Sequence, residues 1–145
     1  MSKLIFLNLP VSDLPRAVSF YEAMGARKDT RFTDETAACM VMSETIHVML
    51  LTHDKFRQFS PKAIADARTT NEVLICISAE SREEVDAQVV KATPNGGRTD
   101  PTPADDYGFM YGRSFEDPDG HSWQVMWMDI AAFEAATGRS SQAAA

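Results

Sequence analysis

A tight turn at residues 115–121 constrains the fold more than any other stretch of this chain. Its sequence is Phe115-Glu116-Asp117-Pro118-Asp119-Gly120-His121. Proline presets one backbone φ angle and glycine supplies a positive one, so this stretch predicts a hairpin turn. We therefore expect strands over residues 108–115 and 121–128, on the two sides of the turn.

The first part of the chain predicts a strand, a helix and three further strands. Residues 4–11 alternate, with Ile5, Leu7, Leu9 and Val11 on one face and Phe6, Asn8 and Pro10 on the other. Ser12 and Asp13 offer N-cap oxygens, Pro15 fits a first helical turn, and the helix ends at Gly25. The strands that follow are expected over 28–33, 37–43 and 46–52.

The same order then returns at an offset of about 70 residues. A strand over 72–79 precedes a capping box at Ser81, which starts a helix, and strands follow at 97–100, 108–115 and 121–128. The chain is thus predicted to be one domain over residues 1–145, made of two βαβββ modules that cannot bury their sheet faces alone. Module 1 spans about 3–52, a connector with two short helical pieces spans 53–70, and module 2 spans about 71–129. In the tail, 130–145, we expect a short helix to Ala136 and disorder from Gly138 onward.

Composition excludes several classes of function. The formal net charge is −7 and no Lys or Arg cluster is present, so we expect no nucleic-acid partner. No run of 18 apolar residues predicts a membrane span, and the N-terminus has no secretion signal, so a cytoplasmic protein is expected. Cys39 and Cys76 lie in apolar runs outside any Cys-x-x-Cys pair, which predicts two reduced core thiols.

Two motifs resemble those of the vicinal oxygen chelate superfamily, the glyoxalase and bleomycin-resistance fold. The first is Leu9-Pro10-Val11-Ser12-Asp13-Leu14, followed by Arg16-Ala17 and Phe20-Tyr21. The second is the turn at 115–121, about 100 residues later. The resemblance implies an α+β fold in which both modules form an eight-stranded, U-shaped mixed sheet around a cavity, with the helices outside. It also implies a homodimer in many members, which include lyases, dioxygenases, fosfomycin-resistance transferases and antibiotic-sequestering proteins.

The resemblance also places four metal ligands, one on the first and one on the last strand of each module. By position these fall on Phe6, Leu50, Leu74 and Gln124, none of which is the His or Glu that the enzymes use. We therefore expect no metal and no other cofactor. Two residues offer an alternative. Glu72 shares the face of Leu74 and is a candidate general base, and a shift of strand register would bring His47 to the cavity.

The cavity is expected to be largely apolar with two amides, which is typical of a small-molecule pocket. Its predicted wall residues are Phe6, Asn8, Val48, Leu50, Leu74, Cys76, Gln124, Met126 and Met128. Tyr107, Tyr111 and Arg113 are expected at its mouth, where Arg113 would hold an anionic group or else pair with Glu116 or Asp106.

Three functions stay open at this point. The first is a protein that binds or sequesters a small molecule without a metal, using Phe6, Asn8, Leu50, Leu74, Tyr107, Tyr111, Arg113 and Gln124. The second is a glyoxalase-like, metal-dependent lyase or related enzyme with displaced ligands, such as Glu72 with His47. The third is a structural or regulatory dimer whose cavity is filled by Phe6, Leu50 and Leu74.

Overall fold

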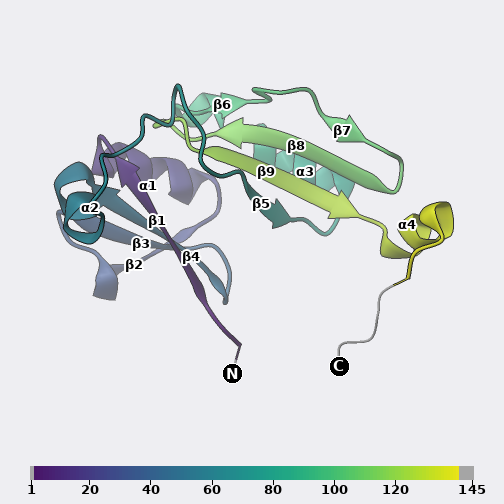
Figure 1. Cartoon of the computed structure of the whole chain (residues 1–145), viewed down its shortest axis with the longest axis horizontal. Coiled ribbons are helices and arrows are strands. Elements are labelled where there is room, and N and C mark those ends of the chain that lie inside the picture. Colours follow the sequence, from purple (N-terminus) through teal and green to yellow (C-terminus); the bar gives the residue numbers. More distant parts are fainter. Residues whose placement is uncertain (1, 141–145) are drawn as a thin grey trace.

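A computed structural model describes residues 2–140, and these fold as a βαβββ module followed by a similar module with one additional short strand (Figure 1). Module 1 contains β1 (Ile5–Val11), α1 (Leu14–Ala23), β2 (Arg27–Asp29), β3 (Ala37–Val41) and β4 (Ile46–Thr52). The connector carries α2 (His53–Phe59). Module 2 contains β5 (Ile75–Ser78), α3 (Arg82–Val89), β6 (Arg98–Thr99), β7 (Asp105–Asp106), β8 (Met110–Glu116) and β9 (Ser122–Met128), and α4 (Ile130–Thr137) follows it.

Each module has its own mixed sheet. The strand order is β1-β4-β3-β2 in module 1 and β5-β9-β8-β6 in module 2, where β7 also pairs with β8. The first and last strands of each module, β1 with β4 and β5 with β9, run parallel, and the other pairs are antiparallel. The predicted α+β class and repeated module are confirmed. Within one chain, however, the strands form two sheets with β1 and β5 as edges, rather than one continuous sheet.

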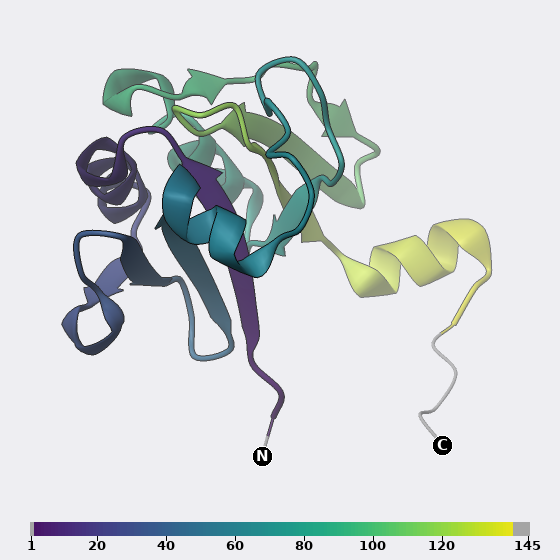
Figure 2. The same cartoon turned by 60° about the vertical axis from the view of Figure 1, so that its left-hand side comes forward.

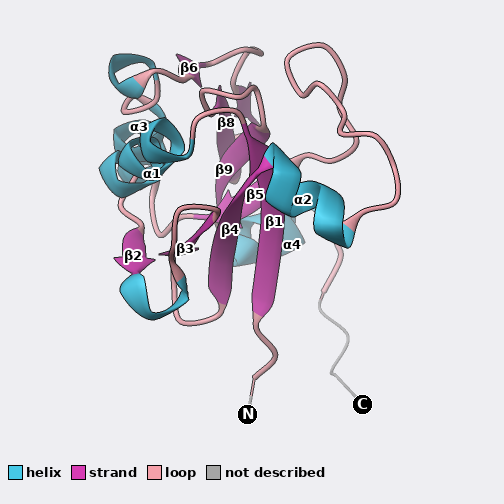
Figure 3. Ribbon diagram, turned by 90° about the vertical axis from the view of Figure 1, so that its left-hand side faces the viewer, coloured by secondary structure: helices cyan, strands magenta, loops and turns pink. Residues whose placement is uncertain are grey.

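The helices divide the molecule into two sides. Figure 3 shows α1 and α3 on one side of the strands and α2 on the other, and Figure 2 shows α4 extending away from both sheets. The hydrophobic core lies on the side of α1 and α3, because the buried residues of both sheets face these helices there. No helix within residues 2–140 has the length and apolar character needed to cross a bilayer.

A buried hydroxyl links the two modules. Tyr21, on α1, donates a hydrogen bond to Asp117 Oδ2 (2.6 Å) and accepts one from Trp123 Nε1 (3.0 Å). Phe20 packs beside them against the ring of Phe115, with 6.2 Å between ring centroids. Burial raises the pKa of both Tyr21 and Asp117, which keeps the phenol a neutral donor. Aromatic packing and a satisfied polar network thus join α1 to the sheet of module 2.

The predicted turn is present, and it also holds the end of β1. Asp117 Oδ1 accepts hydrogen bonds from the backbone N–H groups of Asp119 and His121, each at 2.9 Å. Gly120 has a φ of +90°. The His121 ring Nε2 lies 2.7 Å from the carbonyl oxygen of Pro10, so this nitrogen carries the proton and donates it. The turn therefore fixes the carboxyl end of β1.

Three local expectations differ from the structure. The strand predicted at 28–33 ends at Asp29, because Asp29 accepts from the backbone N–H of Arg31 and starts the 3₁₀ turn Thr30–Phe32. Residues 61–67 form no helix, and the short strand β7 was not predicted. The helix α4 occupies the predicted place in the tail, while the disorder expected there falls partly on residues 141–145, outside the described residues.

Tyr21→Phe is expected to lower the free energy of unfolding by about 2 kcal/mol, because it leaves the buried groups of Asp117 and Trp123 without a partner. Urea unfolding followed by tryptophan fluorescence measures this. Tyr107→Phe is the matched control, since that side chain is exposed. Equal unfolding midpoints for the two variants would show that the hydroxyl does not join the modules.

Candidate functional site

The sheet faces turned away from α1 and α3 form the candidate site. In module 1 this open face carries Phe6 and Asn8 on β1 and His47 and Met49 on β4, because residues opposite each other in a parallel pair share a face. The alternate residues of β1, Leu9 and Val11, are buried in the core. The expected alternation of β1 is thus confirmed, and Phe6 is half exposed on the open face.

The expected orientation of β4 was wrong by one residue. Leu50 and Val48 are fully buried in the core beneath α1, and His47 lies on the open face instead. The imidazole of His47 stacks on the ring of Phe6, with centroids 4.6 Å apart and an interplanar angle of 20°. Its Nδ1 is buried and has no hydrogen-bond partner among residues 2–140. His47 is therefore a polar group on the open face, whereas the alternation along β4 predicts it on the side of the helices.

The open face of module 2 contains a small cavity of about 80 Å³. Gln124 on β9 lies between Cys76 on β5 and Ser114 on β8, and Met126 pairs with Gly112. All five residues line the cavity. Gln124 and Met126 thus border a cavity formed by module 2 alone, whereas the expected cavity was shared by both modules. Cys76 is exposed here rather than in the core, unlike the buried Cys39. Partial burial still raises the pKa of the Cys76 thiol.

Tyr111 lies on the opposite face of β8, beside α3, and not at the expected cavity mouth. The Arg113 side chain turns to the same face, although Arg113 also borders the cavity of about 80 Å³. Arg113 donates to Asp86 (2.7 Å) and to both carboxylate oxygens of Asp100 (3.0 and 2.6 Å). The Tyr111 hydroxyl donates to the same Asp86 oxygen at 2.6 Å. These two hydrogen bonds lower the pKa of Asp86. Neither Glu116 nor Asp106 pairs with Arg113, and Tyr107 is exposed next to Phe109.

Glu72 and Leu74 precede β5 rather than lying within a strand. Leu74 is 59% exposed. Glu72 lines a mostly apolar cavity of about 230 Å³ between the two modules, together with Asn8, Phe56 and Ser122. The structure thus brings together two predicted site residues, Asn8 and Glu72, whereas His47 lies further along the open face beside Phe6.

The open faces do not fit the metal centre that the resemblance implies. Among residues 2–140, no three His, Cys, Asp or Glu side chains converge on a common point. His47, the one imidazole on the open face of β4, stacks against a phenyl ring, which is not a ligand. Gln124 faces Cys76 and Ser114. We therefore assign no chemical step to a metal ion here.

Comparison with known proteins supports the fold. A sequence profile described as "Glyoxalase/Bleomycin resistance protein/Dioxygenase superfamily" matches residues 3–125. No curated protein matches the chain. A hypothetical protein from S. aureus is 25% identical, with a TM-score of 0.68 and 88% and 94% of the two chains covered.

Two further solved structures resemble the chain in fold. A glyoxalase-related enzyme from Fulvimarina pelagi is 18% identical, with a TM-score of 0.73, covering 90% of this chain and 91% of that one. The fosfomycin resistance protein FosX from Mesorhizobium loti is 14% identical, with a TM-score of 0.64 and coverage of 92% and 98%.

Arg113→Gln is expected to lower the free energy of unfolding by about 1–2 kcal/mol, because it removes charge-assisted hydrogen bonds to two half-exposed carboxylates. The lowered pKa of Asp86 stabilises the fold above the unfolded value of 3.8, and this contribution is lost as the pH falls through the folded pKa. The variant should therefore lose less stability on acidification. Urea unfolding between about pH 6 and pH 2.5 tests this.

Arg98→Gln is the control for this measurement, because Arg98 is exposed and forms no ion pair with any residue from 2 to 140. If Arg113→Gln unfolds like wild type and instead loses ligand binding, Arg113 is a ligand anchor and not a structural residue.

Proposed function

Because the chain belongs to the glyoxalase/bleomycin resistance protein/dioxygenase superfamily, we propose that it binds or sequesters a small molecule on the open faces of its two modules. The observation that carries this proposal is the stacking of Phe6 on His47, at a position where the enzymes of the fold hold a metal ligand. An aromatic ring there gives a surface for apolar contact and no lone pair for a cation.

The chemistry of the open faces fits a ligand that is largely apolar and carries a few polar groups. Apolar contact comes from Phe6, Met49 and Met126. Orientation comes from side chains that can donate or accept hydrogen bonds, namely Asn8, His47, Ser114 and Gln124. A mostly apolar wall with a few fixed polar groups is the common composition of small-molecule sites.

The proposed binding unit is a homodimer. Strands β1 and β5 are both sheet edges, and apolar side chains crowd beside them: Leu4, Ile5, Phe6, Val73 and Leu74 are each about half exposed. Unpaired edges flanked by apolar surface are sites where chains associate. A second copy would cover this surface and bring the open face of one module towards that of another. Two free cysteines agree with a reducing, cytoplasmic setting.

One observation favours a metal-dependent enzyme as the second candidate. His47 Nδ1 has no hydrogen-bond partner among residues 2–140, and neutral imidazole is a common metal ligand. Glu72 lines the cavity that contains Asn8 and is exposed enough to move. In a dimer, groups from the two chains would have to converge with His47, because one chain supplies no such cluster within residues 2–140.

The binding proposal predicts saturable ligands in a thermal-shift screen of small amphipathic molecules, including cationic ones. Gln124→Leu and Asn8→Leu should each weaken the best ligand at least tenfold, as expected for the loss of one hydrogen bond of about 1.4 kcal/mol in a dry site. Gln58→Leu on the exposed surface of α2 is the matched amide control. Isothermal titration calorimetry measures the three affinities.

Other outcomes of this screen separate the rival functions. A complete lack of ligands would favour a structural dimer with a filled cavity. Roughly stoichiometric Ni, Zn, Fe or Mn in protein purified without chelators would favour the enzyme, particularly if His47→Phe abolished the metal content.

The dimer proposal predicts a particle of twice the 16.0 kDa chain mass in light scattering coupled to size exclusion. Leu74→Glu should shift it to monomers, because a charge would have to be buried beside β5. Phe32→Glu is the control, since Phe32 is as exposed as Leu74 but lies in the 3₁₀ turn after β2, at the end of the module 1 sheet opposite β1. A wild-type monomer, or equal dissociation by both variants, would contradict this arrangement.

A further inference from the structure

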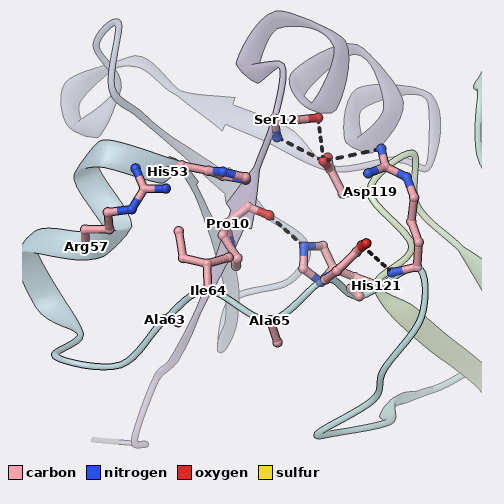
Figure 4. A pocket seen from close by; sticks show the side chains of 12 residues that line it. Pro10, Ser12, His53, Arg57, Ala63, Ile64, Ala65, Asp119 and His121 are labelled. Carbon is pink, nitrogen blue, oxygen red and sulfur yellow. Dashed lines mark hydrogen bonds and ion pairs between the residues drawn. The ribbon is translucent and has the colours of Figure 1, made fainter.

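A separate cavity of about 450 Å³, whose lining includes several charged side chains, lies where the end of β1, α2, the connector and the turn at 117–120 meet. Figure 4 shows His53 and Arg57 reaching towards it from α2, with Asp119 and His121 across from them. Arg68 and Ser12 complete its polar lining. None of these six residues lies on the open faces of the two sheets, although His121 also borders the cavity of about 230 Å³ that contains Asn8 and Glu72.

The walls of this cavity are held in place without a ligand. A side chain at Gly120 would lie 2.9 Å from the Cα and N atoms of Arg68, so the connector backbone rests directly on the turn. The Arg68 guanidinium donates to the carbonyl oxygen of Pro118 at 3.2 Å. His121 is fixed to Pro10 by its ring N–H. Residues far apart in sequence are therefore preorganised around one space, which reduces the cost of ligand binding.

Asp119 borders this cavity, and one of its carboxylate oxygens has no hydrogen-bond partner among residues 2–140. Its side chain is 7% exposed, and Oδ1 accepts from the backbone N–H (2.9 Å) and the hydroxyl (2.8 Å) of Ser12. Arg16 and Arg68 approach the same oxygen only to 3.8 and 4.0 Å. Oδ2 is buried and accepts no hydrogen bond from any residue between 2 and 140. Buried carboxylate oxygens rarely stay unpaired, so this atom points to a missing donor.

The α2 side of the cavity presents hydrogen-bond donors instead of an acceptor. Arg57 uses Nη1 for an exposed ion pair with Asp54 (2.9 Å), and Nη2 and Nε have no partner among the described residues. His53 lies one helical turn before Arg57 and lines the same cavity. A guanidinium with free N–H groups beside an imidazole is suited to a carboxylate or a phosphoryl group.

We propose that this cavity binds a small anion, a carboxylate or phosphoryl compound, that also carries a hydroxyl or ammonium donor. The anionic group contacts Arg57 and His53, and the donor fills the vacant position at Asp119 Oδ2. The proposal is independent of ligand binding on the open faces, because it depends on different side chains and a different charge pattern.

The test uses the full chain and five defined probes at about pH 8, where methyl phosphate is a dianion without a donor. Glycerol 3-phosphate and glycerate carry both features, and their comparison distinguishes a phosphoryl from a carboxylate group. Methyl phosphate and acetate carry only the anion, and glycerol carries only the donors. Titration calorimetry should give saturable binding of glycerol 3-phosphate or glycerate, at least tenfold tighter than its donor-free counterpart, and none of glycerol.

Two substitutions test separately the anion contact at Arg57 and the donor contact at Asp119. Arg57→Gln should weaken the binding of both the donor-bearing probe and its donor-free counterpart at least tenfold. Asp54→Asn, which removes only the exposed partner of Arg57, should leave both affinities unchanged. Asp119→Asn keeps an acceptor for Ser12 and replaces the vacant oxygen with an NH₂ group. In this variant the affinity of the donor-bearing probe should fall to that of its donor-free counterpart. The affinity of the donor-free probe should not change.

Unfolding midpoints identify any variant that fails to fold, and Arg57→Lys then replaces it, with an intermediate affinity expected because lysine keeps the charge but not the fork of donors. The proposal is overturned if neither donor-bearing probe binds saturably, or if Arg57→Gln binds as wild type does. It is also overturned if Gln124→Leu, on the open face, weakens the probes as much as Arg57→Gln does.

Discussion

The carboxylate of Asp117 is the point at which the two modules and the turn between β8 and β9 are joined. One oxygen accepts from the Tyr21 hydroxyl of module 1, and the other holds the backbone N–H groups of Asp119 and His121. Burial raises the pKa of the Asp117 carboxyl group because the charged form is removed from water. Its hydrogen bonds to the protein replace those to water, and losing one of them would leave a buried polar group without a partner. Because the same carboxylate orients the turn, the side chains that follow it reach the end of β1 in fixed positions.

Sequence patterns identified the parts of the fold whose two faces differ in burial. Strand β1 alternates clearly, with Leu9 and Val11 in the core and Phe6 and Asn8 outside, so its orientation was predicted correctly. Strand β4 lacks this contrast, because Leu51 is buried as well as Leu50. Its orientation follows only from the parallel register with β1, which pairs His47 with Phe6, and register is a property of two strands rather than of one.

The site residues that sequence could not place depend on contacts across the chain. Arg113 has the composition of an anion anchor, yet carboxylates on α3 and before β8 take up its donors. Asp119 belongs to a turn motif, but the free oxygen and its surroundings arise because the connector packs on Gly120. The residues that contact Arg113 and Asp119 lie at no fixed spacing from them in the sequence. Periodicity therefore does not predict these contacts. Residue type predicted the chemistry, and tertiary packing decided where that chemistry is available.

The two candidate sites, the open sheet faces and the cavity beside the turn at 117–120, differ in the chemistry of their side chains. On the open faces, Phe6 and the methionines replace possible ligands with apolar surface, so recognition there depends on shape and on single hydrogen bonds from Asn8 or Gln124. The cavity beside the turn is lined by both cationic and anionic side chains. Recognition there depends on a ligand that carries an anionic group and a hydrogen-bond donor together. The chain carries a net charge of −7, so long-range attraction disfavours anions and only a local arrangement such as Arg57 with His53 can select them. Anion binding near this turn would therefore depend on short-range contacts rather than on attraction by the overall charge.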